Sequence, residues 1–262
     1  MVPRPRRGFK PCDTLVAVRG LPPMIDVTFA PGVPSLPDEM LGIFDEGERQ
    51  RLQQLRPTGR PLYIAAHLIV RMLVVRRLVW ATDTPSQGPE PAEFGWTLEP
   101  TGKPRLTYRD GRPQPLHISI SHAGGLAVAA ICEHGPIGVD VEHIEMRRPL
   151  LPIARRFYSP EECAQLEACA ADERTALFHQ WWTRKEAVLK ATGEGLRGGL
   201  SVRVDGGPDG AGWRRVEMPG RNQPLFVRDL RPPDPGLVGA VALEGQPGVI
   251  QSVGVDLAPE WR

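Results

Sequence analysis

The sequence has almost no net charge. Its 32 Lys and Arg residues are balanced by 31 Asp and Glu residues, which leaves a formal charge of +1. A near-neutral chain has no global field that would attract nucleic acid or an anionic membrane, so we expect neither as a partner. Any affinity for acidic ligands must therefore come from a local cluster of charges.

Long apolar runs and regularly spaced cysteines are also absent. The longest apolar run, residues 62–75, contains His67 and Arg71 and is too short and too polar to span a bilayer. The four cysteines form no Cys-x-x-Cys pair and no Cys/His cluster with zinc-site spacing. We interpret them as reduced thiols of a cytoplasmic protein. The basic start, MVPRPRRGFKP, has no apolar segment, so we expect no secretory signal.

Lysine is rare as well. Only four of the 32 basic residues are lysine, at positions 10, 103, 185 and 190. A GC-rich genome that favours arginine codons is the simplest explanation. A lysine retained under that pressure is mildly informative, because a compact ammonium and a planar guanidinium do different jobs. Three of the four lysines lie in the motifs described below.

The order of the predicted elements indicates an α+β protein. The 262 residues suit one large domain or two small ones. Helical periodicity covers residues 38–56, 62–79, 159–170 and 172–193, and strand patterns cover 96–98, 102–106, 116–124, 200–204, 224–230, 237–243 and 248–257. Residues 126–144 are expected to form two strands of a hairpin or meander. This order leaves little room for a parallel sheet and is compatible with two similar halves.

A candidate metal site lies in the segment GVDVEHI. Asp140 and Glu142 are two residues apart in a strand pattern, so both carboxylates lie on one face. Val139 and Val141 then point to the other face, toward the core. Two solvated acids on an exposed strand explain this pattern about as well as a pair of oxygen ligands for Mg²⁺ does.

A second motif lies in the predicted helix FHQWWTRKEAVLKATGEGL. Trp182, Glu186 and Lys190 recur at every fourth position and share one stripe of the helix. Taken alone, they are better explained as a core tryptophan and a Glu–Lys pair worth about 0.3–0.5 kcal/mol. A functional interpretation makes Glu186 a third metal acid and Lys190 a cation for phosphate oxygens.

Two weaker signals precede these motifs. Ser121 and His122 lie where a strand pattern ends, and a lone histidine is more often a packing or surface residue than a catalyst. Gly102-Lys103-Pro104 would alone be a turn, although it contains one of the rare lysines. Each signal is weak by itself, and their order along the chain carries more information.

That order resembles the 4′-phosphopantetheinyl transferases of the surfactin-synthetase-activating, or Sfp-like, type. The family has GKP, a segment like FNLSHS, then G-(I/V)-D-(I/V)-E, then W-(S/T)-x-K-E-A-x-x-K-x-x-G-x-G. This sequence has GKP, ISISHA, GVDVE and WTRKEAVLKATGEG in the same order, and RPLYIAAHLIVR fits a looser upstream pattern. The resemblance covers roughly residues 40–205. Ile118, Ser119 and Ala123 depart from the usual Phe, Asn and Ser.

The resemblance implies an enzyme that transfers the 4′-phosphopantetheine arm of coenzyme A to a serine of apo acyl, peptidyl or polyketide carrier proteins, releasing adenosine 3′,5′-bisphosphate. It implies Mg²⁺ as cofactor, held by Asp140, Glu142 and Glu186. It also implies that Lys190 and His122 neutralise the pyrophosphate. Glu186, directly or through metal-bound water, is the expected general base.

For the rest of coenzyme A, the resemblance implies contacts from Ser121 beside the phosphates and from Lys103 and Arg60 at the adenosine end. Arg49 and Arg51 are weaker candidates for the 3′-phosphate. The expected role of Lys185 is supporting or adjacent to the phosphates.

The implied fold is a pseudo-dimer of two similar α+β halves, each a small antiparallel sheet packed with a long helix. We place the halves at residues 1–133 and 134–262, the second carrying the metal acids. A chain that contains both halves is expected to act as a monomer. Two alternatives remain open: a Mg²⁺-dependent phosphohydrolase of coenzyme A or a nucleotide, and a non-catalytic protein that binds coenzyme A or carrier proteins.

Overall fold

The fold is known from a computed structural model, which describes residues 22–36, 38–80, 89–145, 149–195, 202–254 and 257. The proline-rich start and the first two residues of the strand expected at 200–204 lie outside the described residues. The α+β class predicted from the sequence is confirmed by the mixture of helices and sheets.

The first half builds one larger sheet, one small sheet and a long helix. Its elements are β1 (Met24–Pro31), η1 (Asp38–Ile43), α1 (Glu46–Gln54), η2 (Pro57–Gly59), α2 (Arg60–Trp80), η4 (Pro91–Glu93), β2 (Phe94–Leu98), β3 (Pro104–Tyr108), β4 (His117–Ala123) and β5 (Leu126–Cys132). Strands β2 and β3 pair only with each other, whereas β1, β5 and β4 belong to a four-stranded sheet of order β10-β1-β5-β4.

The second half builds another sheet and another long helix. Its elements are β6 (Ile137–His143), α3 (Leu150–Phe157), α4 (Pro160–Ala168), α5 (Ala171–Thr192), β7 (Trp213–Val216), β8 (Leu225–Leu230), β9 (Leu237–Glu244) and β10 (Val249–Ser252). The sheet order is β6-β9-β8-β7. Strand β10 returns to the first sheet and pairs parallel with β1, so the C-terminal segment crosses the boundary that we expect near residue 134.

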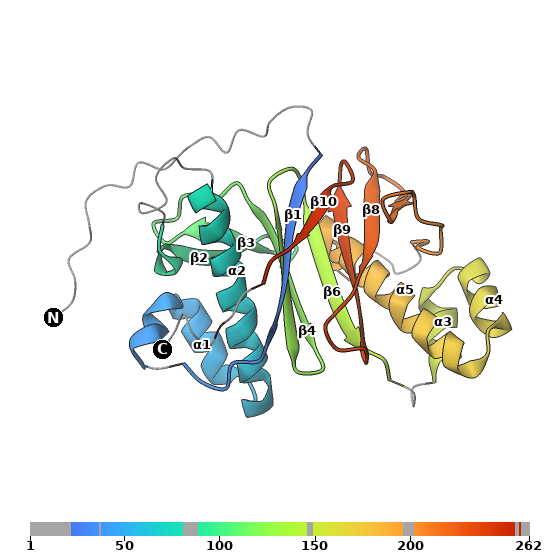
Figure 1. The fold of residues 1–262 in the computed structure, drawn as a ribbon, viewed down its shortest axis with the longest axis horizontal. Coiled ribbons are helices and arrows are strands. Elements are labelled where there is room, and N and C mark those ends of the chain that lie inside the picture. The colour runs from blue at the N-terminus through green and yellow to red at the C-terminus, as the bar shows by residue number, and fades with distance from the viewer. Residues whose placement is uncertain are drawn as a thin grey trace.

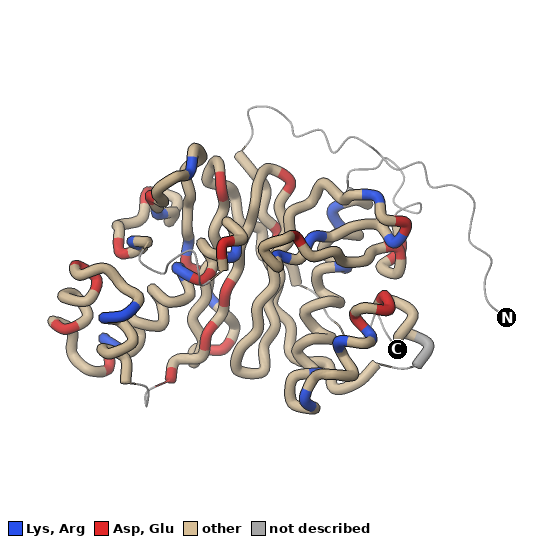
Figure 2. The backbone as a smooth tube through the Cα atoms, turned by 180° about the vertical axis from the view of Figure 1, so that it is seen from behind, with Lys and Arg blue, Asp and Glu red and all other residues tan. Residues whose placement is uncertain are grey.

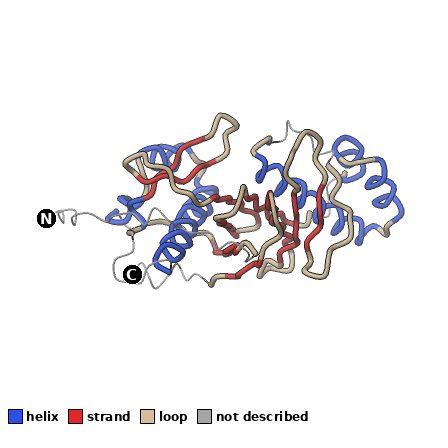
Figure 3. Tube along the Cα trace, turned by 90° about the horizontal axis from the view of Figure 1, so that it is seen from above, coloured by secondary structure: helices blue, strands red, loops and turns tan. Residues whose placement is uncertain are grey.

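The elements stack as helix, sheet, sheet and helix (Figure 1). Helix α2 packs on the outer face of the first sheet, and α5 packs with α3 and α4 on the outer face of the second. The inner faces meet in a third core, where Val27 and Val128 pack with Val139, Val141 and others. Viewed from above, strands fill the middle and helices lie to both sides (Figure 3). The prediction that Val139 and Val141 face the core is thus confirmed.

The two sheets share one order of connection. In the first, β1 pairs with β5 and β5 with β4, all antiparallel. In the second, β6 pairs with β9 and β9 with β8, again antiparallel. In both cases the first strand of the half pairs with its last antiparallel strand, and a long helix lies between them in sequence.

The helices predicted over 62–79, 159–170 and 172–193 are confirmed, whereas the one predicted over 38–56 is divided into η1 and α1. Two helix ends have identifiable causes. Helix α4 begins with a reciprocal capping box between Ser159 and Glu162. Helix α5 ends at Gly193, whose φ of 73° is the left-handed conformation that glycine adopts most easily. Helix α3 and strands β1 and β7 were not predicted, because α3 and β7 are short and β1 lies within the proline-rich first 37 residues.

The predicted hairpin over 126–144 is wrong. Both strands form, but β5 and β6 belong to different sheets. Strand β5 already pairs with β1 on one edge and β4 on the other, which leaves no ladder position for β6. The connecting turn instead packs on β9: a Cβ at Gly135 would lie 2.5 Å from the backbone carbonyl of Glu244. The segment therefore crosses between the sheets.

Charges of both signs are interspersed along the chain in both halves (Figure 2), as expected for a nearly neutral protein. Among the described residues, no helix is long and apolar enough to cross a membrane.

Candidate active site

The site begins with the close packing of α5 on β6. A Cβ at Gly138 would overlap the carbonyl oxygen of Ala187 and the amide nitrogen of Ala191, both backbone atoms of α5. Only glycine lets the helix approach the strand this closely. The approach brings the last two turns of α5, with Glu186 and Lys190, beside Asp140 on β6.

Asp140 is the centre of this arrangement. Its side chain is buried, and its Oδ1 accepts hydrogen bonds from Lys190 Nζ at 2.7 Å and from Ser121 Oγ at 2.8 Å. Its Oδ2 is buried with no hydrogen-bond partner among the described residues. A buried carboxylate oxygen without a donor is costly unless a ligand or ion satisfies it. Lys190 thus pairs with Asp140, fifty residues away, rather than with Glu186 one turn away.

Glu186 lies in the same charged group. Burial raises the pKa of its carboxyl, the nearby Asp140 raises it further, and Lys190 lowers it in part. Two close carboxylates and one ammonium together carry a net negative charge, which a further cation would compensate. The donor set therefore fits a bound divalent cation.

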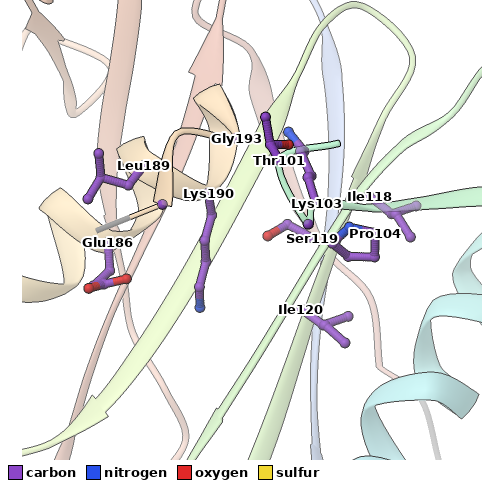
Figure 4. Close-up of a pocket in the computed structure, with 12 residues that line it drawn as sticks. Thr101, Lys103, Pro104, Ile118, Ser119, Ile120, Glu186, Leu189, Lys190 and Gly193 are labelled. Atoms are coloured by element: carbon purple, nitrogen blue, oxygen red, sulfur yellow. The ribbon is translucent and has the colours of Figure 1, made fainter. Parts of the chain in front are cut away.

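A cavity of about 240 Å³ opens beside these residues, between α5, β4 and the β2–β3 turn. Figure 4 shows Glu186, Leu189 and Lys190 projecting from α5, while Lys103 comes from the β2–β3 turn and Ser119 and Ile120 come from β4. The site cavity thus joins one charged wall to one with apolar side chains. Such a combination suits a ligand with a phosphate group and an apolar part.

The edge strands β4 and β6 meet at this cavity. Ser119 Oγ accepts a hydrogen bond from the backbone N–H of Val139 at 2.9 Å. Lys103 Nζ donates to the carbonyls of Ala191 at 2.7 Å and Ile137 at 3.3 Å, and its burial lowers the pKa of the ammonium to about 8. Side chains of the first half therefore satisfy backbone groups on the open edge of β6.

Some predicted site residues lie elsewhere. Arg60 does not line the site cavity; its guanidinium donates to the carbonyls of Leu55 and Gln53, at 3.2 Å each, at the end of α1. Arg49 likewise donates to the carbonyl of Phe44 at 2.6 Å. His122 is exposed at the end of β4, on the alternate face from Ser121, so Ser121 is the residue of that pair that reaches Asp140.

Lys185 is not adjacent to the cavity either. It is fully buried and paired with Glu162 at 2.7 Å, and it also donates to the carbonyl of Val202. Its position one residue before Glu186 turns it to the core side of α5. The two tryptophans keep the anchoring role expected of them, since Trp181 is buried and Trp182 packs against the same core.

Glu142 lies on β6, half-buried, at the next position on the face of Asp140. Within the described ranges, no group of three or more His, Cys, Asp and Glu side chains is arranged to hold a metal ion. The pair that the structure brings together is Asp140 and Glu186, and the three-acid ligand set stays a prediction. Sequence reasoning overlooked Ser119 and Gly138, although a glycine next to an alternating acid motif signals close backbone packing.

Comparison with known proteins shows the family of this chain. The model of the 4′-phosphopantetheinyl transferase superfamily matches residues 136–227, which include β6 and α5. A 4′-phosphopantetheinyl transferase of Bacillus subtilis is 32% identical over 161 residues, covering 60% of this chain and 67% of the relative. The chain belongs to the 4′-phosphopantetheinyl transferase superfamily. The GVDVE and WTRKEAVLKATGEG motifs lie within the part that the family model matches.

Two further relatives match over shorter stretches. A protein of Synechocystis sp. is 35% identical over 155 residues, which are 59% of this chain and 57% of that protein. The 4′-phosphopantetheinyl transferase Sfp of Bacillus subtilis is 36% identical over 129 residues, 48% of this chain and 54% of Sfp. The matches thus span little more than half the length of these relatives.

Proposed function

We propose that this protein transfers the 4′-phosphopantetheine arm of coenzyme A to a serine hydroxyl of an apo acyl, peptidyl or polyketide carrier protein, releasing adenosine 3′,5′-bisphosphate. The observation that carries the proposal is the Asp140–Lys190–Glu186 group beside the site cavity. These residues match the acids and the lysine of the Sfp-like motifs that the sequence resembles. The reaction breaks the pyrophosphate bond of coenzyme A and forms a phosphodiester to the serine.

Mg²⁺ is the proposed cofactor. The buried Oδ2 of Asp140 and the carboxyl of Glu186 offer it hard oxygen ligands, and Glu142 is the proposed third acid. When bound, the ion would neutralise charge on the pyrophosphate of coenzyme A. Ser121 holds the carboxylate of Asp140 in place by its hydrogen bond to Oδ1. The second oxygen, Oδ2, is thereby left directed away from Ser121.

The remaining steps belong to side chains of this chain. Lys190 supplies a positive charge at the pyrophosphate, where charge develops as the leaving group departs. Glu186 is the proposed general base for the serine hydroxyl, and the burial that raises the pKa of its carboxyl makes its carboxylate a stronger base. Lys103 lines the cavity and is the proposed contact at the adenosine end. His122 is a further proposed phosphate contact, although its side chain is exposed at the end of β4 and is not among those that line the cavity.

The Sfp-like pseudo-dimer is also part of the proposal. Besides the shared strand order, each half begins a short helix with a capping box whose glutamate is buried. Glu48 pairs with Arg71 on α2, and Glu162 pairs with Lys185 on α5, each 23 residues further along. The same device at the same spacing supports an origin of both halves from one unit. A single chain then completes the site, so we propose a monomer.

The three described cysteines are free thiols, which supports the proposed cytoplasmic location.

The test is to incubate the protein with coenzyme A, Mg²⁺ and a panel of apo carrier proteins, and to measure carrier mass. Gain of the phosphopantetheine mass on the carrier serine is the expected result. Cleavage of coenzyme A without any carrier would support the phosphohydrolase alternative instead. Binding of coenzyme A with neither cleavage nor transfer would support the non-catalytic alternative.

A further inference from the structure

Arg221 lies in the connection between β7 and β8, outside every motif that the sequence singles out. Its guanidinium bonds to three partners. Nε and Nη2 donate to Glu194 Oε1 at 3.1 and 2.9 Å, Nη2 donates to the carbonyl of Thr192 at 3.0 Å, and Nη1 donates to both carboxylate oxygens of Glu244 at 3.1 and 3.0 Å. Few surface arginines use so much of their donor capacity.

These partners join separate parts of the second half. Thr192 is the last residue of α5, Glu194 lies two residues after it, and Glu244 is the last residue of β9. The Arg221 side chain is only 22% exposed, and Glu244 is 14% exposed. A partly buried, multiply bonded guanidinium holds its partners more firmly than an open surface pair does. Arg221 therefore fastens the end of α5 to the body of the second sheet.

The segment that Arg221 holds is rich in glycine. Gly193 and Gly195 both have left-handed backbone conformations and flank Glu194, so Glu194 carries the only side chain of this Gly-Glu-Gly segment. Both glycines line the site cavity. A Cβ at Gly193 would lie 3.2 Å from Thr101 Oγ1 and 3.6 Å from Lys103 Cδ, so this wall lies directly against the β2–β3 turn. Movement of Glu194 would move the cavity wall.

Two cations from opposite halves meet this helix end. Lys103 donates to the carbonyl of Ala191 and Arg221 to that of Thr192. Carbonyls at a helix C-terminus lack intrahelical partners and carry partial negative charge, so both contacts are favourable. Lys103 also lines the cavity, whereas Arg221 does not. Arg221 instead lines a neighbouring pocket together with Glu194 and Glu244. It is therefore placed to act on a ligand in the site cavity through the segment that it holds.

We infer that Arg221 is a positioning residue for the site cavity: through Glu194 and the Thr192 carbonyl, anchored by Glu244, it fixes the Gly193–Gly195 wall against which coenzyme A binds. This inference rests on the proposed function for the identity of the ligand. The tether, meaning the contacts of Arg221 with Thr192, Glu194 and Glu244, does not depend on that function.

The first test replaces Arg221 by Gln and compares it with Arg215→Gln. Arg215 is a matched control, because it lies in the same region and makes one exposed pair with Glu217 at 2.7 Å. In the carrier assay, Arg221→Gln should raise the KM for coenzyme A about tenfold, with kcat reduced less than about threefold. Arg221→Lys should have a KM between those of the wild-type protein and Arg221→Gln, because one ammonium can reach one of the carboxylates. Arg215→Gln should leave both constants unchanged.

The second test measures hydrogen exchange of the backbone amides at residues 189–195 without any ligand. Arg221→Gln should accelerate exchange there by about tenfold while exchange in β9 changes little. Unchanged exchange in this segment, or an unchanged KM in a folded Arg221→Gln protein, would overturn the inference. Absence of transfer by the wild-type protein would instead refute the proposed function, and the exchange measurement would still decide whether the tether exists.

Discussion

The ammonium of Lys185 lies 2.7 Å from a carboxylate oxygen of Glu162, and both side chains are fully buried. The second carboxylate oxygen of Glu162 accepts a hydrogen bond from the backbone N–H of Val204 at 3.0 Å. Tyr158 covers the ammonium with its ring, 4.8 Å from the centroid. The pair links α4, α5 and the segment that follows α5, immediately beside the residue proposed as the general base.

Breaking this pair should destabilise the fold strongly. Lys185→Met leaves Glu162 charged and buried without its cation, so the free energy of unfolding should fall by about 3–5 kcal/mol. Urea denaturation of the purified variants measures the change. The control is Arg155→Ala, which removes an exposed pair with Glu167 and should cost less than about 1 kcal/mol. The prediction is wrong if the two variants lose similar stability.

Gly138→Ala should disrupt the approach of α5 to β6. The new methyl group would overlap backbone atoms of Ala187 and Ala191, which cannot move without shifting the helix. We expect a loss of about 3 kcal/mol or more in unfolding free energy, and loss of transfer activity. Gly206→Ala is the matched control, because nothing lies within 4 Å of a Cβ there. A Gly138→Ala protein with wild-type stability would contradict the packing described here.

Asp140→Asn should abolish stabilisation by Mg²⁺. If Asp140 is a metal ligand, Mg²⁺ at a hundredfold excess over its Kd should stabilise the wild-type protein by about 2.7 kcal/mol, and Asn should remove most of this gain. Thermal melts with Mg²⁺ and with a chelator supply the measurement. Asp172→Asn, an exposed acid in the first turn of α5, should keep the full response. An equal Mg²⁺ response in Asp140→Asn would remove that residue from the ligand set.

The buried ammonium of Lys103 should make the free energy of unfolding depend on pH in the alkaline range. Burial lowers the pKa of its ammonium to about 8, from a usual value of 10.5, although Glu99 and Glu244 favour the charged form. Between these two pH values the unfolded chain binds more protons at this residue than the folded chain does. The contribution of Lys103 to the unfolding free energy should therefore rise with pH through that window and be constant below it.

The comparison for this prediction is Lys103→Met. The unfolding free energy of the wild-type protein, relative to that of Lys103→Met, should increase from pH 8 to pH 10, as measured by urea denaturation at each pH. Arg215→Met serves as the control, because an arginine stays protonated throughout and its difference from wild type should be flat. A flat difference for Lys103 as well would show that its ammonium is not buried.

Much of the candidate site could be predicted from the sequence, because its motifs are local. The two-residue spacing of Asp140 and Glu142 and the four-residue spacing of Glu186 and Lys190 each fix a shared face once the element type is known. Element types followed from periodicity. By contrast, the hairpin expected over 126–144 failed because strand pairing depends on competition for edges, and local patterns do not encode that competition.

The partners of Arg60 and Lys185 could not be predicted from the sequence for a related reason. We expected a coenzyme A contact for Arg60 and a supporting or phosphate-adjacent role for Lys185, and local spacing does not reveal the carbonyls and the carboxylate that they contact. Arg221 was not singled out at all, since an arginine in a loop has no local signature that separates a tether from a surface charge.

The sequence by itself determined the α+β class, the long helices with their caps, and the order of motifs that assigns the chain to its superfamily. Only the tertiary structure decided that Lys190 pairs with Asp140 rather than Glu186, that Gly138 sets the helix against the strand, and that Lys103 and Arg221 converge on the end of α5. The physical reason is distance along the chain: helix and strand preferences depend on neighbours within a few residues, whereas each of these contacts joins residues about 30 to 90 positions apart.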